Sequence, residues 1–407
     1  MNTPEFAQQA TLLNALLTQA TGQAQLTPTD LSGFVQAATT LLQTGVDQVV
    51  RAISAVMGRT IIEQRPYYER FRSMEVTESG YGMHVRKLSF GDNAFVDDPG
   101  YAWPVFYDAS HTANPTGDSE SVDPFKVRKP VVQQTNFYGQ SVYSDYYTIF
   151  DSQLKGSFMD PGAMSEFFRA LVLNINNKYT QARESLARST LANFIGGILG
   201  AAAAASAPAQ DTDRVIHLLT EYNTETGLSL TAQTVYAPTN FPSFMRWVFS
   251  RIKTICRLME ERSVIFQKTV AGVYIPRHTP MRDQRVYLLA DLMDKMDANV
   301  LSITFNPDKV NIPTFEPVGY WQSIDSRDAL KITAAAIGAN GAQTTYSVDE
   351  TKILGCIVDR EALGYARTGS NLEPARNAAG EYTTFWLHET LRAWNDHTEK
   401  GVVLLLD

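Results

Sequence analysis

The longest regular pattern of hydrophobic positions along the chain covers residues 160–197. Apolar side chains recur there at steps of mostly three or four, which is the spacing of one face of an α-helix. They are Met164, Phe168, Leu171, Ile175, Tyr179, Ala182, Leu186, Leu191 and Phe194. Asp160 and Pro161 suit the first positions of a helix, and the pair Gly196 and Gly197 is expected to end it. At 1.5 Å per residue the helix would be about 50 Å long.

We therefore interpret this helix as a strut. Its apolar stripe should rest on strands, while its charged face, which includes Arg183, should point outward or toward neighbouring copies of the chain. A coiled coil is a weaker interpretation, because the heptad pattern fails over the polar residues 174–178. A plain long core helix remains an alternative.

Strand-like patterns flank a long segment that has no helical period. Residues 81–90 and 131–150 are rich in Tyr, Val, Phe and Thr, which favours extended strands. About forty residues separate them, and a connection of that length is usually functional or disordered. Its acidic residues come first and its basic residues last. We expect it to dock onto a neighbouring copy, with a solvated loop as the alternative. The candidate contact residues are Asp97, Asp98, Asp118, Glu120, Lys126, Arg128 and Lys129.

The remaining patterns mix helices and strands without a regular β-α-β alternation. Residues 1–60 show three short helical patterns, and residues 241–267 show a second long one. The apolar face of the latter consists of Phe244, Val248, Ile252, Ile255, Met259 and, further on, Ile265. Apolar strand patterns occur at 285–290, 300–305 and 354–359, and strand-like runs over 382–406 are broken by a polar stretch at 395–400. The predicted fold class is α+β.

Composition narrows the class of protein. The 407 residues are 44% hydrophobic and 11% aromatic, as in a folded protein with a large core. The formal net charge is −8 and the basic residues form no run, whereas a dedicated nucleic-acid binder would show a basic footprint. The charge-free residues 191–209 are mostly Ala, Gly and Ser, so we expect no membrane span. Cys256 and Cys356 are expected to be buried free thiols, consistent with a reducing cytoplasm.

No arrangement of residues predicts catalysis, a cofactor or a metal site. The six histidines include no HExxH pair. The nearest approach to a metal-ligand set is His388 and Glu389 with His397, on a strand-rich segment where the two imidazoles would point to opposite faces. Gly338 and Gly341 lack the spacing and the following lysine of a phosphate-binding loop. We therefore expect a structural protein rather than an enzyme.

The order of these parts resembles that of a tailed-phage major capsid protein of the Hong Kong 97 type. Four segments are similar to those of major head proteins of small tailed phages: TIIEQRPYYERF at 60–71, LLTEYNTETGLS at 218–229, FPSFMRWVFSRI at 241–252 and RHTPMRDQRVYLLA at 277–290. The resemblance implies an N-terminal helical arm (1–65), an extended β-loop with flanking strands (66–157), a peripheral domain with the spine helix and the second long helix (158–269), an axial domain (270–360) and closing strands that return to the peripheral domain (361–407).

By that resemblance the chain is expected to self-assemble into hexamers and pentamers of an icosahedral shell. The shell would enclose double-stranded DNA without binding it specifically. The implied partners are further copies of the chain, a separate scaffold protein and a portal, with no membrane and no cofactor. The implied location is the virion, after assembly in the host cytoplasm. The alternatives are an encapsulin-like compartment or another phage assembly protein, and an enzyme with an unrecognised site.

Overall fold

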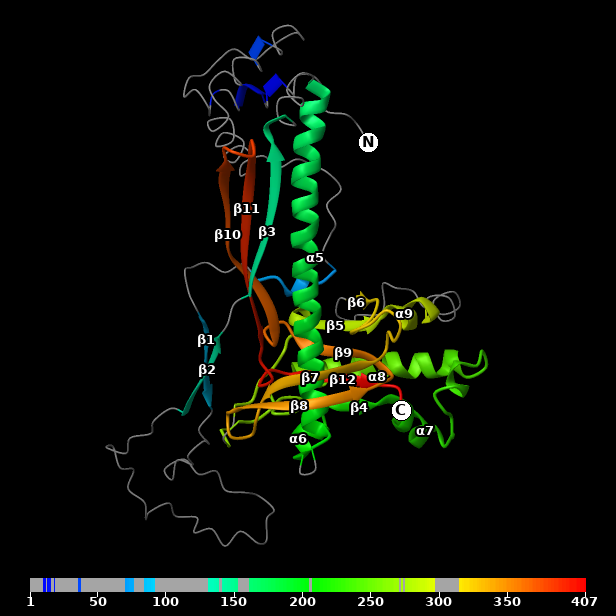
Figure 1. Ribbon diagram of the computed structural model, residues 1–407. Coiled ribbons are helices and arrows are strands. Elements are labelled where there is room, and N and C mark those ends of the chain that lie inside the picture. Colours follow the sequence, from blue (N-terminus) through cyan, green and yellow to red (C-terminus); the bar gives the residue numbers. More distant parts are fainter. Residues whose placement is uncertain are drawn as a thin grey trace, which may run out of the picture.

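The long helix organises the computed structural model of the chain (Figure 1). This helix, α5 (Pro161–Ala202), has 42 residues, so it is about 60 Å long. A three-stranded sheet lies beside its first part, and the body of the molecule surrounds its last part. The structure describes residues 10–11, 13–15, 18, 36–37, 70–76, 84–91, 131–138, 141–152, 161–204, 207–270, 272–273, 275–296 and 315–407.

Four β-structures accompany α5. They are a three-stranded sheet of order β10-β11-β3, a five-stranded sheet of order β4-β12-β9-β5-β6, and the two-stranded ribbons β1-β2 and β7-β8. The strands are β1 (His84–Gly91), β2 (Val131–Tyr138), β3 (Ser141–Phe150), β4 (Val215–His217), β5 (Gln284–Leu289), β6 (Phe315–Val318), β7 (Leu330–Ile337), β8 (Gln343–Glu350), β9 (Ile353–Asp359), β10 (Leu363–Asn377), β11 (Tyr382–Asn395) and β12 (Gly401–Leu405). The shorter helices are α6 (Ala209–Thr212), α7 (Leu218–Thr226), α8 (Phe241–Glu260) and α9 (Ala290–Met296), with 3-10 turns η1 (Arg72–Met74), η2 (Thr234–Tyr236) and η3 (Met281–Asp283).

The end of α5 differs from the prediction. Gly196 and Gly197 do not end the helix, which continues to its bound at residue 202. The glycines instead allow α5 to approach the β7-β8 ribbon closely. A Cβ at Gly196 would lie 2.9 Å from the Cβ of Ala334, and one at Gly200 would lie 2.7 Å from the Cγ of Tyr346. The predicted stop was wrong because close packing, and not a left-handed cap, requires glycine here.

One face of the three-stranded sheet packs on α5. Ile149 and Phe385 are buried on this face. Glu389 lies on the same face, and Arg183 of the helix donates to it from Nε at 2.9 Å. The expectation that Arg183 points outward or toward a neighbouring copy is therefore wrong. Its guanidinium is used inside the subunit, between the helix and the sheet.

The five-stranded sheet contains the main core. Every residue of its central strands β12 and β9 is buried. The predicted apolar face of α8 is confirmed for Phe244, Val248, Ile252, Ile255 and Met259, which are all buried. The helix ends at residue 260 and not at 267, so the placement of Ile265 on this face was wrong. The predicted strands at 285–290 and 354–359 are confirmed as β5 and β9. Cys256 and Cys356 are buried free thiols, as predicted.

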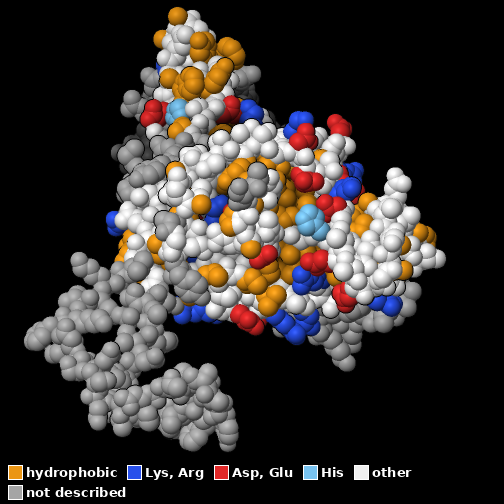
Figure 2. Space-filling view, turned by 90° about the horizontal axis from the view of Figure 1, so that it is seen from below, with side chains coloured by type: hydrophobic (Ala, Val, Ile, Leu, Met, Phe, Trp, Pro, Cys, Tyr) orange, Lys and Arg blue, Asp and Glu red, His pale blue; other side chains and the backbone are white. Residues whose placement is uncertain are grey.

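The remaining predictions about the chain's organisation fall partly outside the described residues. Most of the predicted helical arm and the predicted strand at 300–305 lie there. On the face seen in Figure 2, Lys and Arg side chains are interspersed with Asp and Glu side chains around hydrophobic ones. Within the described residues, no helix is long and apolar enough to cross a membrane.

Candidate functional site

The seven charged residues predicted to contact a neighbouring copy lie outside the described residues. They are Asp97, Asp98, Asp118, Glu120, Lys126, Arg128 and Lys129, all within the connection between β1 and β2. The structure therefore leaves their contacts as a prediction. The described residues supply other candidate features, which are two exposed apolar surfaces, a buried cluster of charges and a polar cavity.

The first surface is the outer face of the three-stranded sheet, on the side away from α5. Val142, Tyr146 and Phe150 alternate along β3 on this face, and Trp386 lies opposite Tyr146 on β11. Tyr146 is 58% exposed and Trp386 is 39% exposed, although their ring centroids are only 4.9 Å apart. We call these four residues, with the partly exposed Tyr382, the aromatic face. An exposed cluster of this kind indicates an interaction surface.

The second surface lies on the ribbon formed by β1 and β2. Leu88 and Phe90 share one face of β1, and Val132 lies opposite Phe90 on β2. These three side chains are about half exposed or more, with Phe90 at 63%. We call them the ribbon's apolar face. Arg86 shares this face, since it lies two residues before Leu88, and it is exposed too.

The opposite face of the ribbon carries charge and turns toward the body. Lys87 forms ion pairs with Asp396 at 3.2 Å and with Glu399. Arg277 pairs with the same Glu399 carboxylate and donates to the hydroxyl of Ser89 on β1 at 3.1 Å. We call Lys87, Arg277, Asp396 and Glu399 the four-charge cluster. Two cations and two nearly buried carboxylates therefore hold β1 against the body.

Burial and charge both act on this cluster. Burial alone would lower the pKa of Lys87, but the charges of Asp396 and Glu399 outweigh it, so that pKa is raised. Burial alone would raise the pKa of Asp396. The positive charge of Lys87, the hydrogen bonds from Thr398 and the positive charge of Arg277 together outweigh burial and lower this pKa. For Glu399, burial prevails over the nearby cations and raises the pKa. Lys87 and Asp396 therefore stay charged at neutral pH, and Glu399 is the carboxylate in the cluster that takes up a proton first on acidification.

The polar stretch at 395–400 that interrupts the closing strands lies inside the molecule. Its members 396–400 are all buried. Lys400 donates to the carbonyl of Glu261 at 2.7 Å, just beyond the end of α8. The His397 ring stacks on Phe194 at 4.9 Å between centroids, and burial, followed by the charge of Arg214, lowers its pKa to about 3. A buried neutral imidazole of this kind serves packing. Among the described residues, no group of three His, Cys, Asp or Glu side chains is placed to hold a metal ion.

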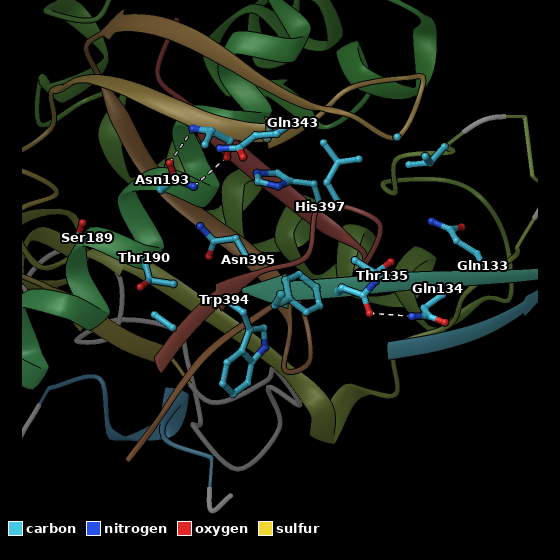
Figure 3. Close-up of a pocket in the computed structure, with 18 residues that line it drawn as sticks. Gln133, Gln134, Thr135, Ser189, Thr190, Asn193, Gln343, Trp394, Asn395 and His397 are labelled. Carbon is cyan, nitrogen blue, oxygen red and sulfur yellow. Dashed lines mark hydrogen bonds between the residues drawn. The ribbon is translucent and has the colours of Figure 1, made fainter. Parts of the chain in front are cut away.

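A cavity of about 800 Å³ lies between β2 and the body. Figure 3 shows Asn395 and His397 between Asn193 of α5 and Thr135 of the ribbon. Asn193 uses its carboxamide on both backbone groups of Ala335, at 2.8 and 2.9 Å. Carboxamides and hydroxyls dominate the polar lining, and among the described lining residues there is no Lys, Arg, Asp or Glu. The cavity therefore offers hydrogen bonds without charge.

Comparison with known proteins gives this arrangement its context. A family model for Phi29-like phage major capsid proteins matches residues 13–403. The chain belongs to this family. It is a structural shell protein, as the sequence resemblance implied, and its family places it in the virion.

Solved structures agree on the fold of this capsid protein. The capsid structure of Staphylococcus phage Andhra matches with a TM-score of 0.51 and 10% identity, over 86% of this chain and 87% of that chain. A structure from bacteriophage P68, titled for its head fiber and inner core protein gp22, matches with a TM-score of 0.50 and 10% identity over the same shares of the two chains. We found no match among curated protein sequences. The predicted α+β fold of the Hong Kong 97 type is confirmed.

The sequence did not reveal which residues of this capsid protein form its exposed surfaces. Along residues 141–150, apolar or aromatic side chains occur on both faces of the strand. The sequence therefore could not show which of the two faces α5 covers. Lys87 carried no signal, because its buried partner Glu399 lies 312 residues away in the chain. The one usable signal was the polar stretch at 395–400. A stretch with charged residues between two apolar strands forms either an exposed loop or a buried network of ion pairs and hydrogen bonds.

Proposed function

We propose that this capsid protein assembles as hexamers and pentamers into an icosahedral shell around double-stranded DNA. The observation that carries the proposal is that one chain exposes two apolar surfaces on different elements, the aromatic face and the ribbon's apolar face. When one patch binds the other patch of the next subunit, the contact is heterologous. Repeating such a contact generates a closed ring if the rotation between successive subunits adds up to a full turn. Hexamers and pentamers are such rings.

We infer that the ribbon's apolar face of one subunit docks on the aromatic face of the next. Leu88, Phe90 and Val132 are about half exposed or more, so each has roughly 1 kcal/mol of burial to gain. Charges support the same pairing. Arg86 lies on the ribbon's apolar face, and the exposed Glu373 lies opposite Trp386 in the sheet register, at the border of the aromatic face.

The connection between β1 and β2 supports the same overlap. Its acidic residues Asp97, Asp98, Asp118 and Glu120 precede its basic residues Lys126, Arg128 and Lys129. A connection that carries both signs can pair its acidic residues with the basic residues of the next copy. The domain boundaries that go with this assembly are an arm at 1–65, a β-loop at 66–157, a peripheral domain at 158–269, an axial domain at 270–360 and closing strands at 361–407.

Further partners follow from the same proposal. A formal net charge of −8 suits a shell that confines DNA without binding it specifically. A separate scaffold protein would set the shell size and a portal would occupy one vertex. The two buried free thiols suit assembly in the reducing host cytoplasm. No catalytic step is part of this function.

The decisive experiment is Tyr146→Lys, examined by electron microscopy and analytical sedimentation after expression with and without a scaffold protein. The ring of Tyr146 is 58% exposed, so the variant should fold with an unchanged melting temperature but fail to form shells. The matched control is Ile324→Lys, because Ile324 is 65% exposed and lies between β6 and β7, outside the strands that carry the two surfaces. Shells from Tyr146→Lys as abundant as those of the wild type would contradict the proposed contact. A wild-type protein that never assembles would contradict the function itself.

A further inference from the structure

The β1-β2 ribbon is inverted with respect to an ordinary amphipathic hairpin. Such a hairpin turns its apolar face to the core and its polar face to water. In this ribbon, Leu88 and Phe90 face outward, whereas Lys87 and Ser89 face the body. Among the described strands, β1 and β2 pair only with each other. The body-facing side also carries Phe137 of β2, and the ion pairs and hydrogen bonds described between β1 and the body involve Lys87 and Ser89.

The four-charge cluster supplies the specific contacts of this joint. The Lys87 side chain is 20% exposed, and its partners Asp396 and Glu399 are 0% and 6% exposed. Charges buried to this degree attract each other far more strongly than charges in water, and a partner removed from such a pair leaves the other charge desolvated and unpaired. The geometry of the ribbon thus depends on whether Lys87 is engaged.

The body side of the cluster has contacts of its own. Asp396 accepts hydrogen bonds from the backbone N–H of Thr398 at 2.9 Å and from its hydroxyl at 2.6 Å. The backbone of Arg277 pairs with Ser263 in both directions at 3.1 Å. The turn at 396–399 and Arg277 therefore keep their positions without Lys87.

The cavity beneath β2 provides room for movement. Its volume of about 800 Å³ lies on the ribbon's body-facing side, where Gln133 and Thr135 face Asn395 and Asn193 across it. In one position of the ribbon, the carboxamides and hydroxyls on both walls can form hydrogen bonds with water. In another position, they can form hydrogen bonds with each other across the cavity. A polar joint beside a polar cavity is what a pivoting element requires.

We propose that the β1-β2 ribbon is a movable arm whose orientation is locked by the engagement of Lys87 with Asp396 and Glu399. Lys87 is a positioning residue, which fixes the angle at which Leu88, Phe90 and Val132 are presented to the next subunit. This role rests on the proposed self-assembly for its consequence in the shell. The lock itself is a property of the single chain.

The test is amide hydrogen exchange on the unassembled protein, comparing wild type with Lys87→Met. We expect exchange over residues 84–91 and 131–138 to become at least tenfold faster, with no change in α8. The matched control is Lys331→Met, because Lys331 also pairs with an aspartate, Asp349, on a two-stranded ribbon but is 77% exposed. Lys87→Arg should retain the protection. Unchanged exchange in the ribbon, faster exchange throughout the body, or failure of Lys87→Met to fold would each overturn the proposal.

A reversible lock provides a second arm of the experiment. The hydroxyls of Ser89 and Thr398 both accept from Nη2 of Arg277 at 3.1 Å, so they lie close together across the joint. In the Lys87→Met background, Ser89→Cys with Thr398→Cys, oxidised by glutathione disulfide, should restore the protection, and dithiothreitol should remove it again. Thiols that fail to cross-link, or a cross-link that restores nothing, would count against the joint.

Shell formation separates this inference from the proposed function. Lys87→Met should give shells of mixed diameter and Lys331→Met shells of wild-type diameter, as seen by electron microscopy. Uniform wild-type shells from Lys87→Met would refute the positioning role. If the wild type itself formed no shells, the proposed function would fail, whereas the exchange measurement on the single chain would still decide the lock.

Discussion

Gly200 of α5 offers the sharpest test of how the long helix packs. Replacing it with alanine sets two effects against each other. Alanine in a helix interior is favoured over glycine by about 0.8–1.0 kcal/mol, so on an isolated helix Gly200→Ala would stabilise. In this structure the new methyl group would overlap the Cβ of Tyr346 and lie 2.7 Å from its Cγ, whereas real Cβ atoms essentially never come within 3.0 Å of another heavy atom.

The clash should outweigh the gain in helix propensity. The Cβ of Tyr346 is fixed to the backbone of β8, so rotation of the side chain cannot relieve the overlap and the β7-β8 ribbon must move. Gly196 packs on Ala334 of the same ribbon, so the movement would disturb a second close contact. Overpacking of this kind costs about 1–3 kcal/mol, and the rigid neighbour places Gly200 in the upper part of that range. We expect Gly200→Ala to lower the free energy of unfolding by about 1–2 kcal/mol net.

Urea denaturation followed by fluorescence would measure this difference as a shift of the midpoint. Gly369→Ala is the matched control, because among the described residues no atom lies within 4 Å of a Cβ built there and the backbone is not left-handed. That variant should be neutral or up to about 1 kcal/mol more stable, from reduced freedom of the unfolded chain. If Gly200→Ala were as stable as the control, the close approach of α5 to β8 would be refuted.

Two further predictions concern buried charges. The pKa of His397 is lowered to about 3, so between pH 6.5 and 3 the unfolded chain takes up a proton that the folded chain refuses, and stability falls as the pH falls. His397→Gln should therefore reduce the stability lost between pH 7 and pH 5 by about 2 kcal/mol in urea titrations, and an unchanged loss would contradict a neutral buried imidazole. Arg183→Ala should destabilise the subunit by about 1–3 kcal/mol, because Glu389 is 3% exposed and would retain only Arg367 at 3.3 Å among the ion-pair partners described. Adding Glu389→Gln should recover part of the melting temperature, whereas an unchanged melting temperature for Arg183→Ala alone would show that the pair contributes nothing.

The elements that follow from local periodicity could be predicted from the sequence. The apolar face of α8 and the strands β5 and β9 each bury a regular pattern in the core, so spacing alone specified them. The end of α5 could not be predicted, because glycine is equally suited to a stop and to close packing. Only the position of the β7-β8 ribbon decides between the two. The direction of Arg183 was missed for a related reason, since a charge on a polar helix face can meet either water or a buried carboxylate.

The candidate surfaces depended even more on long-range contacts. Both faces of β3 carry aromatic or apolar residues. The aromatic face can be recognised only once the structure shows that α5 covers the opposite face. The four-charge cluster joins β1 to Arg277 and to the turn at 396–399, which are remote in the chain. Hydrophobic periodicity shows which residues lie on one face of a single helix or strand, but not which elements contact each other. The sequence alone therefore could not predict that these charged residues form one cluster.

The position of β12 has a consequence for when the subunit can fold. This strand lies between β4, to which it is parallel, and β9, to which it is antiparallel, so it fills the middle of the five-stranded sheet. During synthesis, β5, β6 and β9 can pair with one another before β12 is made, whereas β4 has no described strand to pair with until residues 401–405 have emerged. A nascent chain therefore cannot join β4 to the rest of the five-stranded sheet until these residues have been made.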